Sequence, residues 1–275
     1  MSPVAIWRMI TSVLLPCSAG RLAFNLTAAR PAVNPPPGHR KRLQSSPFDR
    51  SLRHRGADGI FRRHKETAPL MGLFRLLLQD PWTFALLAFP LLYSIILHEL
   101  AHGWVALRMG DPTAKRLGRL SLNPLRHLDP IGTLMLFVFG FGWARPVPVV
   151  VQNLHPVRRG FILVSAAGIA ANTAVAFVAL FLQRWLQPGG VAAPFLYILA
   201  HVNLMLAAFN LIPIPPLDGA KILLGLSSGP LQRMLIRLER YGFFIVLAML
   251  ALGLLDPLIR LFRAVLLALI GLFLP

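Results

Sequence analysis

Residues 82–107 read WTFALLAFPLLYSIILHELAHGWVAL, and this stretch decides the fold class. It holds 26 residues with one acid, Glu99, and no Lys or Arg. At a rise of about 1.5 Å per residue, a helix over this stretch is about 39 Å long, which exceeds the roughly 30 Å hydrocarbon core of a bilayer. We therefore predict a tilted membrane-spanning helix here.

The composition of the whole chain agrees with a membrane protein. Of its 275 residues, 56% are hydrophobic and only 14% are charged, and the mean hydropathy is +0.63. A soluble domain carries about 25% charged residues, so this chain lacks the polar surface of one. The single cysteine, Cys17, excludes a disulfide framework and a cysteine-rich zinc fold.

Further apolar stretches follow the first one. We expect spans over 161–183 and 191–217, a short span over 241–255 and a last helix from Leu258 toward Leu274. The uncharged stretch 131–144 is too short to cross, and its glycines predict a re-entrant hairpin that protein or water must surround. The predicted fold is an all-α polytopic membrane protein with about four spanning helices, a re-entrant hairpin and a C-terminal helix.

Residues 1–70 differ from the rest of the chain. They carry half of the net charge of +18, in Pro-rich and Arg-rich runs without a sustained hydrophobic period. We predict a disordered basic N-terminal segment here and a membrane-embedded domain over 71–275. Two alternatives remain open, namely translation from Met71 or removal of the segment. Nucleic acid is not expected as a partner, because aromatic residues do not alternate with the bases.

The first predicted span carries His98, Glu99 and His102. Residues four apart share a helix face, so the two imidazoles can bind one zinc ion and Glu99 can reach its water. The alternatives are a chance match or a hydrogen-bonded polar patch. Polar groups inside a span cost about 2.5–3.5 kcal/mol when charged, and those found there usually serve a function, so we favour the metal site.

A catalytic zinc site commonly needs a third protein ligand, and Asp218 is the candidate. It follows an uncharged run that ends in prolines and precedes Gly219, which permits a tight turn. The alternative for Asp218 is a cap on a helix that starts at Ala220. We favour the ligand, because the first and fourth spans end on the same side. His127 is expected to be a structural or supporting group rather than a ligand.

The distribution of charge predicts the orientation. Twelve of the sixteen Lys and Arg residues in 71–275 lie on the side that the C-terminal end of the first span reaches. Cytoplasmic loops carry the excess of these residues, so we expect the site to face the cytoplasm.

These motifs together resemble those of the site-2 protease family (M50) of intramembrane zinc metalloproteases, in its compact bacterial branch without a PDZ domain. The matching pieces are HELAH over 98–102, NLIPIPPLDG over 210–219, the segment 123–133, the segment 142–149, and Gly168 with Asn172. The resemblance implies that His98, His102 and Asp218 are the metal ligands, that Glu99 is the general base, and that Asn210 lies near the scissile carbonyl. It also implies a bacterial inner membrane as the location.

The predicted function is therefore an intramembrane zinc endopeptidase that holds one Zn²⁺ and cleaves a transmembrane protein substrate within the lipid bilayer. The alternative is a zinc-binding membrane protein that transports or senses metal without hydrolysis. An inactive homologue is disfavoured by the intact Glu99. Besides Asn210, Asn172 and Asn203 are candidate donors to the oxyanion, with interhelical hydrogen bonding as their alternative.

Overall fold

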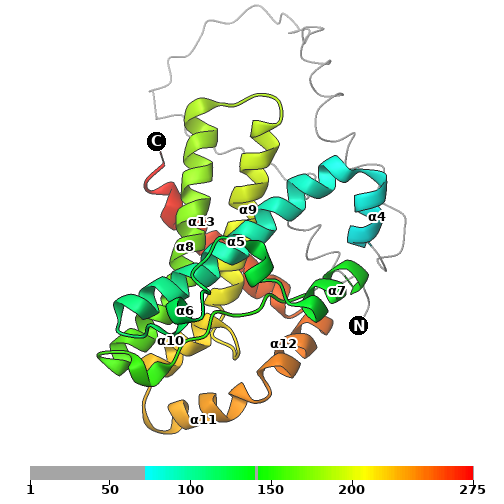
Figure 1. Cartoon of the computed structure of the whole chain (residues 1–275). Coiled ribbons are helices and arrows are strands. Elements are labelled where there is room, and N and C mark those ends of the chain that lie inside the picture. Colours follow the sequence, from blue (N-terminus) through cyan, green and yellow to red (C-terminus); the bar gives the residue numbers. More distant parts are fainter. Residues whose placement is uncertain (1–71, 140–141, 275) are drawn as a thin grey trace, which may run out of the picture. The chain divides into compact units, whose positions relative to one another are not determined.

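A computed structural model describes residues 72–139 and 142–274 of the chain (Figure 1). The predicted disordered segment 1–70 lies outside these residues. Every regular element within them is helical, and one isolated β-bridge joins Leu128 to Ala144. The all-α prediction is thereby confirmed. The elements are α4 (Gly72–Gln79), α5 (Pro81–Arg108), α6 (Thr113–Arg116), η1 (Pro124–Arg126), α7 (Pro130–Phe139), η2 (Val151–Asn153), α8 (Val157–Leu186), α9 (Ala192–Leu211), α10 (Asp218–Leu226), α11 (Gly229–Glu239), α12 (Gly242–Ala251) and α13 (Leu255–Gly271).

Helix α5 is the predicted first span, extended by one residue at each end. The Asp80 carboxylate caps the start of this helix, because it accepts hydrogen bonds from the Thr83 N–H and hydroxyl. Pro81 suits the first helical position, because it has no backbone N–H that would be left without a partner there. The basic residue Arg108 closes its last turn, where a positive charge is favourable.

Three helices, α5, α8 and α9, are long and apolar enough to cross a membrane. Helices α12 and α13 are also apolar and meet at an angle of 97°, so they make a fourth span if the bent pair counts as one. This number agrees with the prediction of about four spans.

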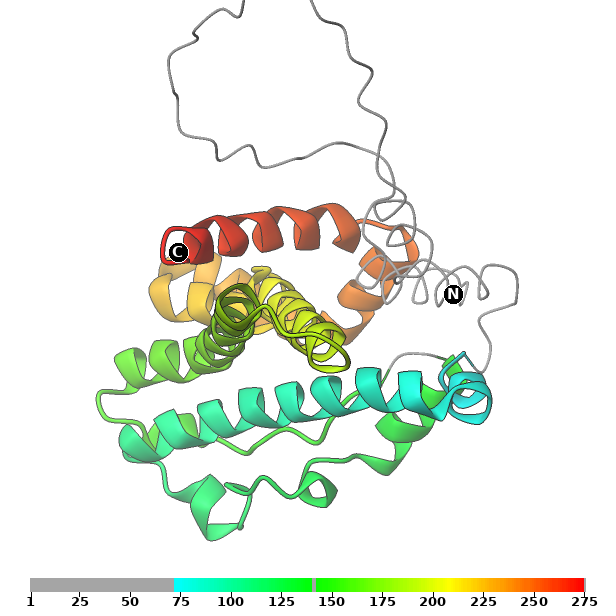
Figure 2. The same cartoon turned by 90° about the horizontal axis from the view of Figure 1, so that it is seen from above.

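Helices α8 and α9 form the centre of the bundle and lie between α5 and α13 (Figure 2). Small residues make their close approach possible, because Ala176 on α8 and Ala207 and Ala208 on α9 are fully buried. Leu204 and Ile212 extend this core toward Leu255 and Ile259, which α13 contributes.

The predicted hairpin over 131–144 is a helix followed by an extended return. Helix α7 leads in, and the segment after it runs back so closely that a Cβ on Gly132 would lie 2.2 Å from the Trp143 carbonyl oxygen. The Arg145 N–H donates to the His127 carbonyl at 2.8 Å, which fixes the base of the hairpin. The extended segment then continues past Val147 beside α5.

The structure excludes one alternative and corrects one prediction. Asp218 does not cap a helix that starts at Ala220, because α10 begins at Asp218 itself with Leu217 as its N-cap residue. The last helix begins at Leu255 rather than Leu258. Pro257 then occupies the first turn, where a backbone N–H has no helical partner and its absence costs little.

Candidate metal centre

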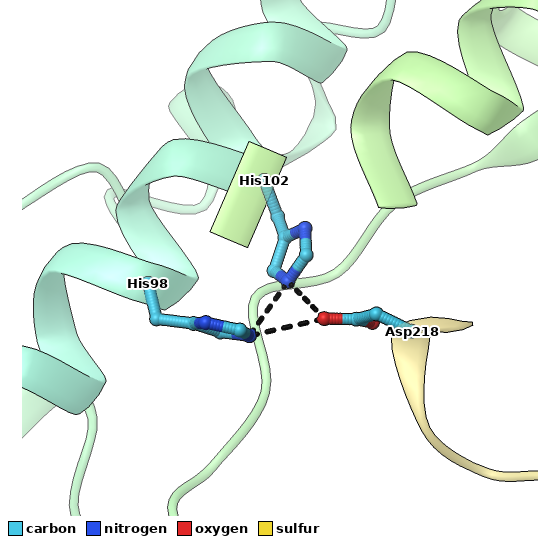
Figure 3. A group of neighbouring side chains, drawn as sticks. All are labelled: His98, His102 and Asp218. Carbon is cyan, nitrogen blue, oxygen red and sulfur yellow. Dashed lines mark hydrogen bonds and ion pairs between the residues drawn. The ribbon is translucent and has the colours of Figure 1, made fainter. Parts of the chain in front are cut away.

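Three side chains from two helices converge on one point. The Nε2 atoms of His98 and His102 lie 3.0 Å apart, and each lies 3.1 Å from the Asp218 Oδ2 atom (Figure 3). His98 and Asp218 are buried, with 7% and 3% of their surface exposed. Among the described residues, this is the one group of three or more His, Cys, Asp or Glu side chains that can hold a metal ion.

The hydrogen bonds behind the two imidazoles orient them toward this point. The His98 Nδ1–H donates to the Asn172 Oδ1 atom at 3.1 Å, and the His102 Nδ1–H donates to the Val164 carbonyl at 2.6 Å. Because an acceptor faces each Nδ1, the proton belongs there and each Nε2 keeps its lone pair for the centre. Two such nitrogens facing one carboxylate oxygen form a donor set that suits a zinc ion.

Helix α8 leaves room for this centre through Gly168. A Cβ on that residue would lie 2.5 Å from the His98 Nε2 atom and 2.6 Å from the His102 Nε2 atom. No real Cβ makes such contacts, so only glycine allows α8 to pass behind the two imidazoles. This supplies a physical reason for the glycine that accompanies Asn172 in the sequence.

Helix α10 presents Asp218 by packing closely against its neighbours. A Cβ on Gly219 would lie 2.3 Å from the Leu211 carbonyl oxygen, so the glycine lets the first turn of α10 approach the end of α9. At the other end of α10, the Arg158 guanidinium donates to the carbonyls of Gly225 and Leu226 at 2.7 and 2.8 Å. Lys221 lies one turn after Asp218, and its Nζ is 3.0 Å from the Asp218 Oδ1 atom.

Glu99 lies next to the three converging residues without joining them. Its Oε2 atom accepts a hydrogen bond of 2.8 Å from the Val147 N–H of the extended segment. Glu99 and the three converging residues line an open cavity of about 1120 Å³, whose lining also includes Gln232 and Glu239. A space of this size accommodates a stretch of extended polypeptide beside the centre.

The chain is similar in sequence to proteins named zinc metalloproteases. The protein of Bacillus subtilis (strain 168) named "Putative zinc metalloprotease YwhC" is 41% identical over 172 residues, which cover 59% of this chain and 78% of that protein. A family model described as "Peptidase family M50" matches residues 188–253, which include Asp218 and the sequence before it. The chain belongs to peptidase family M50.

A second relative agrees with this assignment. "Putative zinc metalloprotease Rip2" of Mycolicibacterium smegmatis is 33% identical over 165 residues, and the match covers 58% of this chain and 64% of that protein. Among solved structures, "Site-2 Protease from Methanocaldococcus jannaschii" matches with a TM-score of 0.42 and 25% identity, covering 70% of this chain and 80% of that chain. The predicted family and the predicted peptidase class are confirmed.

The structure places the remaining candidates in different surroundings. Asn210 lines the cavity, and its amide donates to the Leu206 carbonyl at 3.0 Å. Asn203 is fully buried and donates to the Ser94 hydroxyl at 2.7 Å. It therefore links α9 to α5 by an interhelical hydrogen bond, which was its alternative role. His127 stands apart from the ligands, with its Nε2 atom 2.7 Å from the Ser121 carbonyl.

Sequence reasoning missed the groups that support the centre from behind. The Val164 carbonyl and the Val147 N–H are backbone groups, so the residue types at these positions do not predict their contacts with His102 and Glu99. Lys221 had a weak signal, because a base three residues after an acid at the start of a helix lies on the same face. Asn172 was a candidate oxyanion donor through its amide N–H, and the acceptor role of its Oδ1 atom toward His98 was not expected.

Proposed function

We propose that the protein is an intramembrane zinc endopeptidase in which His98, His102 and Asp218 hold the metal and Glu99 is the general base. The observation that carries this proposal is the convergence of three metal-binding atoms within 3.1 Å of one another, beside a carboxylate and in an open cavity. Two of those atoms belong to α5, which is a candidate membrane span.

Zinc is the metal that the donor set and the family indicate. Two imidazole nitrogens and one carboxylate oxygen are the ligands of many catalytic zinc sites, with a fourth position left open. The predicted zinc cofactor is thereby confirmed. When bound, zinc supplies a water ligand with a pKa near 7 and polarises the scissile carbonyl.

The protein's own residues then move one proton and orient one carbonyl. Glu99 takes the proton of the attacking water on its carboxylate and passes it to the leaving amine. Asn210 uses one amide hydrogen within its own helix, and the second is available to the carbonyl oxygen of the substrate. The cavity binds the substrate residues on either side of the cleaved bond.

The substrate class follows from the location of the centre. The protein is an integral membrane protein, and the centre lies on one of its spans, so the substrate is a transmembrane segment of another protein. A helix hides its carbonyls in internal hydrogen bonds, so that segment must become extended before cleavage. The excess of Lys and Arg at this end of α5 supports a cytoplasmic site in a bacterial inner membrane.

The test uses the purified full chain in phospholipid vesicles with a panel of single-span membrane proteins. We expect cleavage within or next to the span, loss of cleavage after treatment with 1,10-phenanthroline, and recovery after zinc is returned. The soluble domain of each cleaved protein, released from its span, serves as the matched control and is expected to stay intact. Cleavage that survives complete removal of zinc contradicts the proposal.

A further inference from the structure

Arg119 is a buried cation that the metal centre and its ligands leave unexplained. It lies in the loop after α6, and only 9% of its surface is exposed. Its Nη2 atom donates to the carbonyls of Arg145 and Pro146, at 2.6 and 3.1 Å. Burying a guanidinium is costly unless its contacts compensate, so this arrangement needs a reason.

The residue after those two carbonyls is the one that contacts Glu99. Val147 stands between Pro146 and Pro148, and it alone among the three has a backbone N–H. That N–H donates to the Glu99 Oε2 atom at 2.8 Å. Arg119 therefore holds the peptide units that aim this N–H at the carboxylate.

The surface of α5 is shaped to receive the same segment. Gly103 lies one turn after Glu99, and a Cβ there would lie 2.9 Å from the Val147 Cγ1 atom and 2.5 Å from the Leu120 Cδ2 atom. The glycine thus lets Val147, and the residue that follows Arg119, approach the helix on the face that carries Glu99.

The charges agree with this arrangement. Burial lowers the pKa of the Arg119 guanidinium, neighbouring Arg145 lowers it further, and the Glu99 carboxylate opposes both. The Arg119 guanidinium and the Glu99 carboxylate therefore attract each other across residues 145–147. A guanidinium remains charged at any physiological pH, so the attraction persists during the reaction.

We propose that Arg119 is a positioning residue for Glu99, which acts by clamping residues 145–147 so that the Val147 N–H holds one carboxylate oxygen. No other hydrogen bond reaches the Glu99 carboxylate from the described residues, so its second oxygen is left for the proton. This proposal rests on the proposed role of Glu99 as the base.

The first measurement compares Arg119→Gln and Arg119→Lys with Arg116→Gln in the full chain. Arg116 is an exposed base nearby, so it controls for the change in charge. With a fluorescein-labelled single-span protein that the wild type cleaves as the probe, we expect Arg119→Gln to lower kcat about 10- to 100-fold, with KM within about twofold and one zinc per chain retained. We expect Arg119→Lys to lower kcat less than Arg119→Gln does, because its ammonium keeps the positive charge but lacks the planar set of N–H donors of a guanidinium. Arg116→Gln behaves as the wild type.

The second measurement asks whether Arg119 acts through Glu99. Glu99→Asp withdraws the carboxylate from the Val147 N–H, so Arg119→Gln is expected to cost much less in that background than in the wild type. An equal loss in both backgrounds overturns the proposal. So does a loss of zinc in Arg119→Gln, a change confined to KM, or a failure of both Arg119 variants to fold.

A third readout needs no turnover. Acetohydroxamate binding to the cobalt-loaded protein is followed by the visible spectrum, because the chelating hydroxamate gives its hydroxyl proton to a carboxylate beside the metal. We expect about tenfold weaker binding in Arg119→Gln and no change in Arg116→Gln. If the wild type fails to cleave any substrate, the proposed function fails, whereas equal hydroxamate binding in all variants overturns the role of Arg119.

Discussion

Helices α5 and α10 supply the two halves of the centre in different ways. On α5, the four-residue spacing of His98 and His102 places both imidazoles on one face of a 28-residue helix. On α10, Asp218 is the first residue of a nine-residue helix that follows a proline-rich break. The spacing within α5 therefore determines the position of the two imidazoles, whereas the position of the Asp218 carboxylate depends on the packing of α10 against α8 and α9.

The supports of the two halves differ in the same sense. The imidazoles of α5 are oriented by single acceptors on α8, the Asn172 amide oxygen and the Val164 carbonyl. The carboxylate of α10 depends on Gly219 at one end of the helix and on Arg158 at the other. Substitutions of the two histidines on α5, or of residues on α8 that contact them, should thus weaken metal binding most, while those around α10 should change how the carboxylate meets the metal.

The largest effect is expected from the α5 half. The double substitution His98→Ala and His102→Ala removes two of three ligands, so zinc content should fall to background and cleavage should stop. Metal analysis of the purified protein measures the first result, and cleavage of a single-span membrane protein measures the second. His155→Ala, which alters a histidine outside the centre, is the matched control. Full zinc content in the double variant contradicts the assignment of these ligands.

Gly168→Ala disturbs the same half of the centre while both histidines remain in place. The new Cβ meets both Nε2 atoms at 2.5–2.6 Å, so the imidazoles must move apart and zinc affinity should drop sharply. Alanine is the better helix former, so α8 itself is not weakened. Gly189→Ala is the control, because its Cβ meets nothing within 4 Å. Zinc competition with a chelator measures the effect, and unchanged affinity would show that α8 yields at this point.

Lys221→Met sharpens the comparison on the α10 side. The ammonium holds the Asp218 Oδ1 atom at 3.0 Å and leaves Oδ2 for the centre. Its removal frees the carboxylate to rotate, and we expect about a tenfold loss of zinc affinity with the folded state intact. Lys115→Met on exposed α6 controls for the charge. An affinity equal to that of wild type would mean that α10 packing alone orients Asp218.

The smallest effect on the centre is expected from Asp111, whose role is in the fold. Burial raises the pKa of this carboxyl, but hydrogen bonds from Thr113, Asn153 and the Val150 N–H lower it more, and the net pKa is below its usual 3.8. A depressed folded-state pKa adds stability above the unfolded value, and this stability is lost as the pH falls through the folded one.

We therefore expect Asp111→Asn to lower the free energy of unfolding by about 2 kcal/mol at pH 7, because Asp111 is fully buried and loses the acceptor for the Val150 N–H. Thermal unfolding across a pH series tests this. The difference from wild type should shrink as the pH drops below about 4. A difference that is constant with pH would show that the charge of Asp111 does not matter.

The same contrast explains how much the sequence could predict. The spans and the pairing of His98 with His102 depend on periods within one segment, and α5 confirms the first and places the two imidazoles together. Asp218 could be selected only through topology, and local reasoning alone favoured a cap. The structure instead gives the N-cap position to Leu217 and leaves the carboxylate to the centre.

What could not be predicted is the contact between segments distant in the sequence. The Val147 N–H reaches Glu99 across 48 positions, through a hairpin whose return strand has no regular pattern. Helix α13 begins at Leu255, before the predicted Leu258, because Pro257 falls in its first turn, where a proline breaks no hydrogen bond.

The most direct test of the central claim is the zinc content of Glu99→Gln, measured on the same sample as its peptide cleavage. Glutamine is nearly isosteric and can still accept from the Val147 N–H, but it cannot take a proton. General base catalysis contributes about 10²- to 10⁴-fold in rate, so we predict one zinc per chain and cleavage reduced by at least about 100-fold. A variant that loses its zinc would place Glu99 in the metal shell, and a variant that keeps both zinc and cleavage would contradict its role as the base.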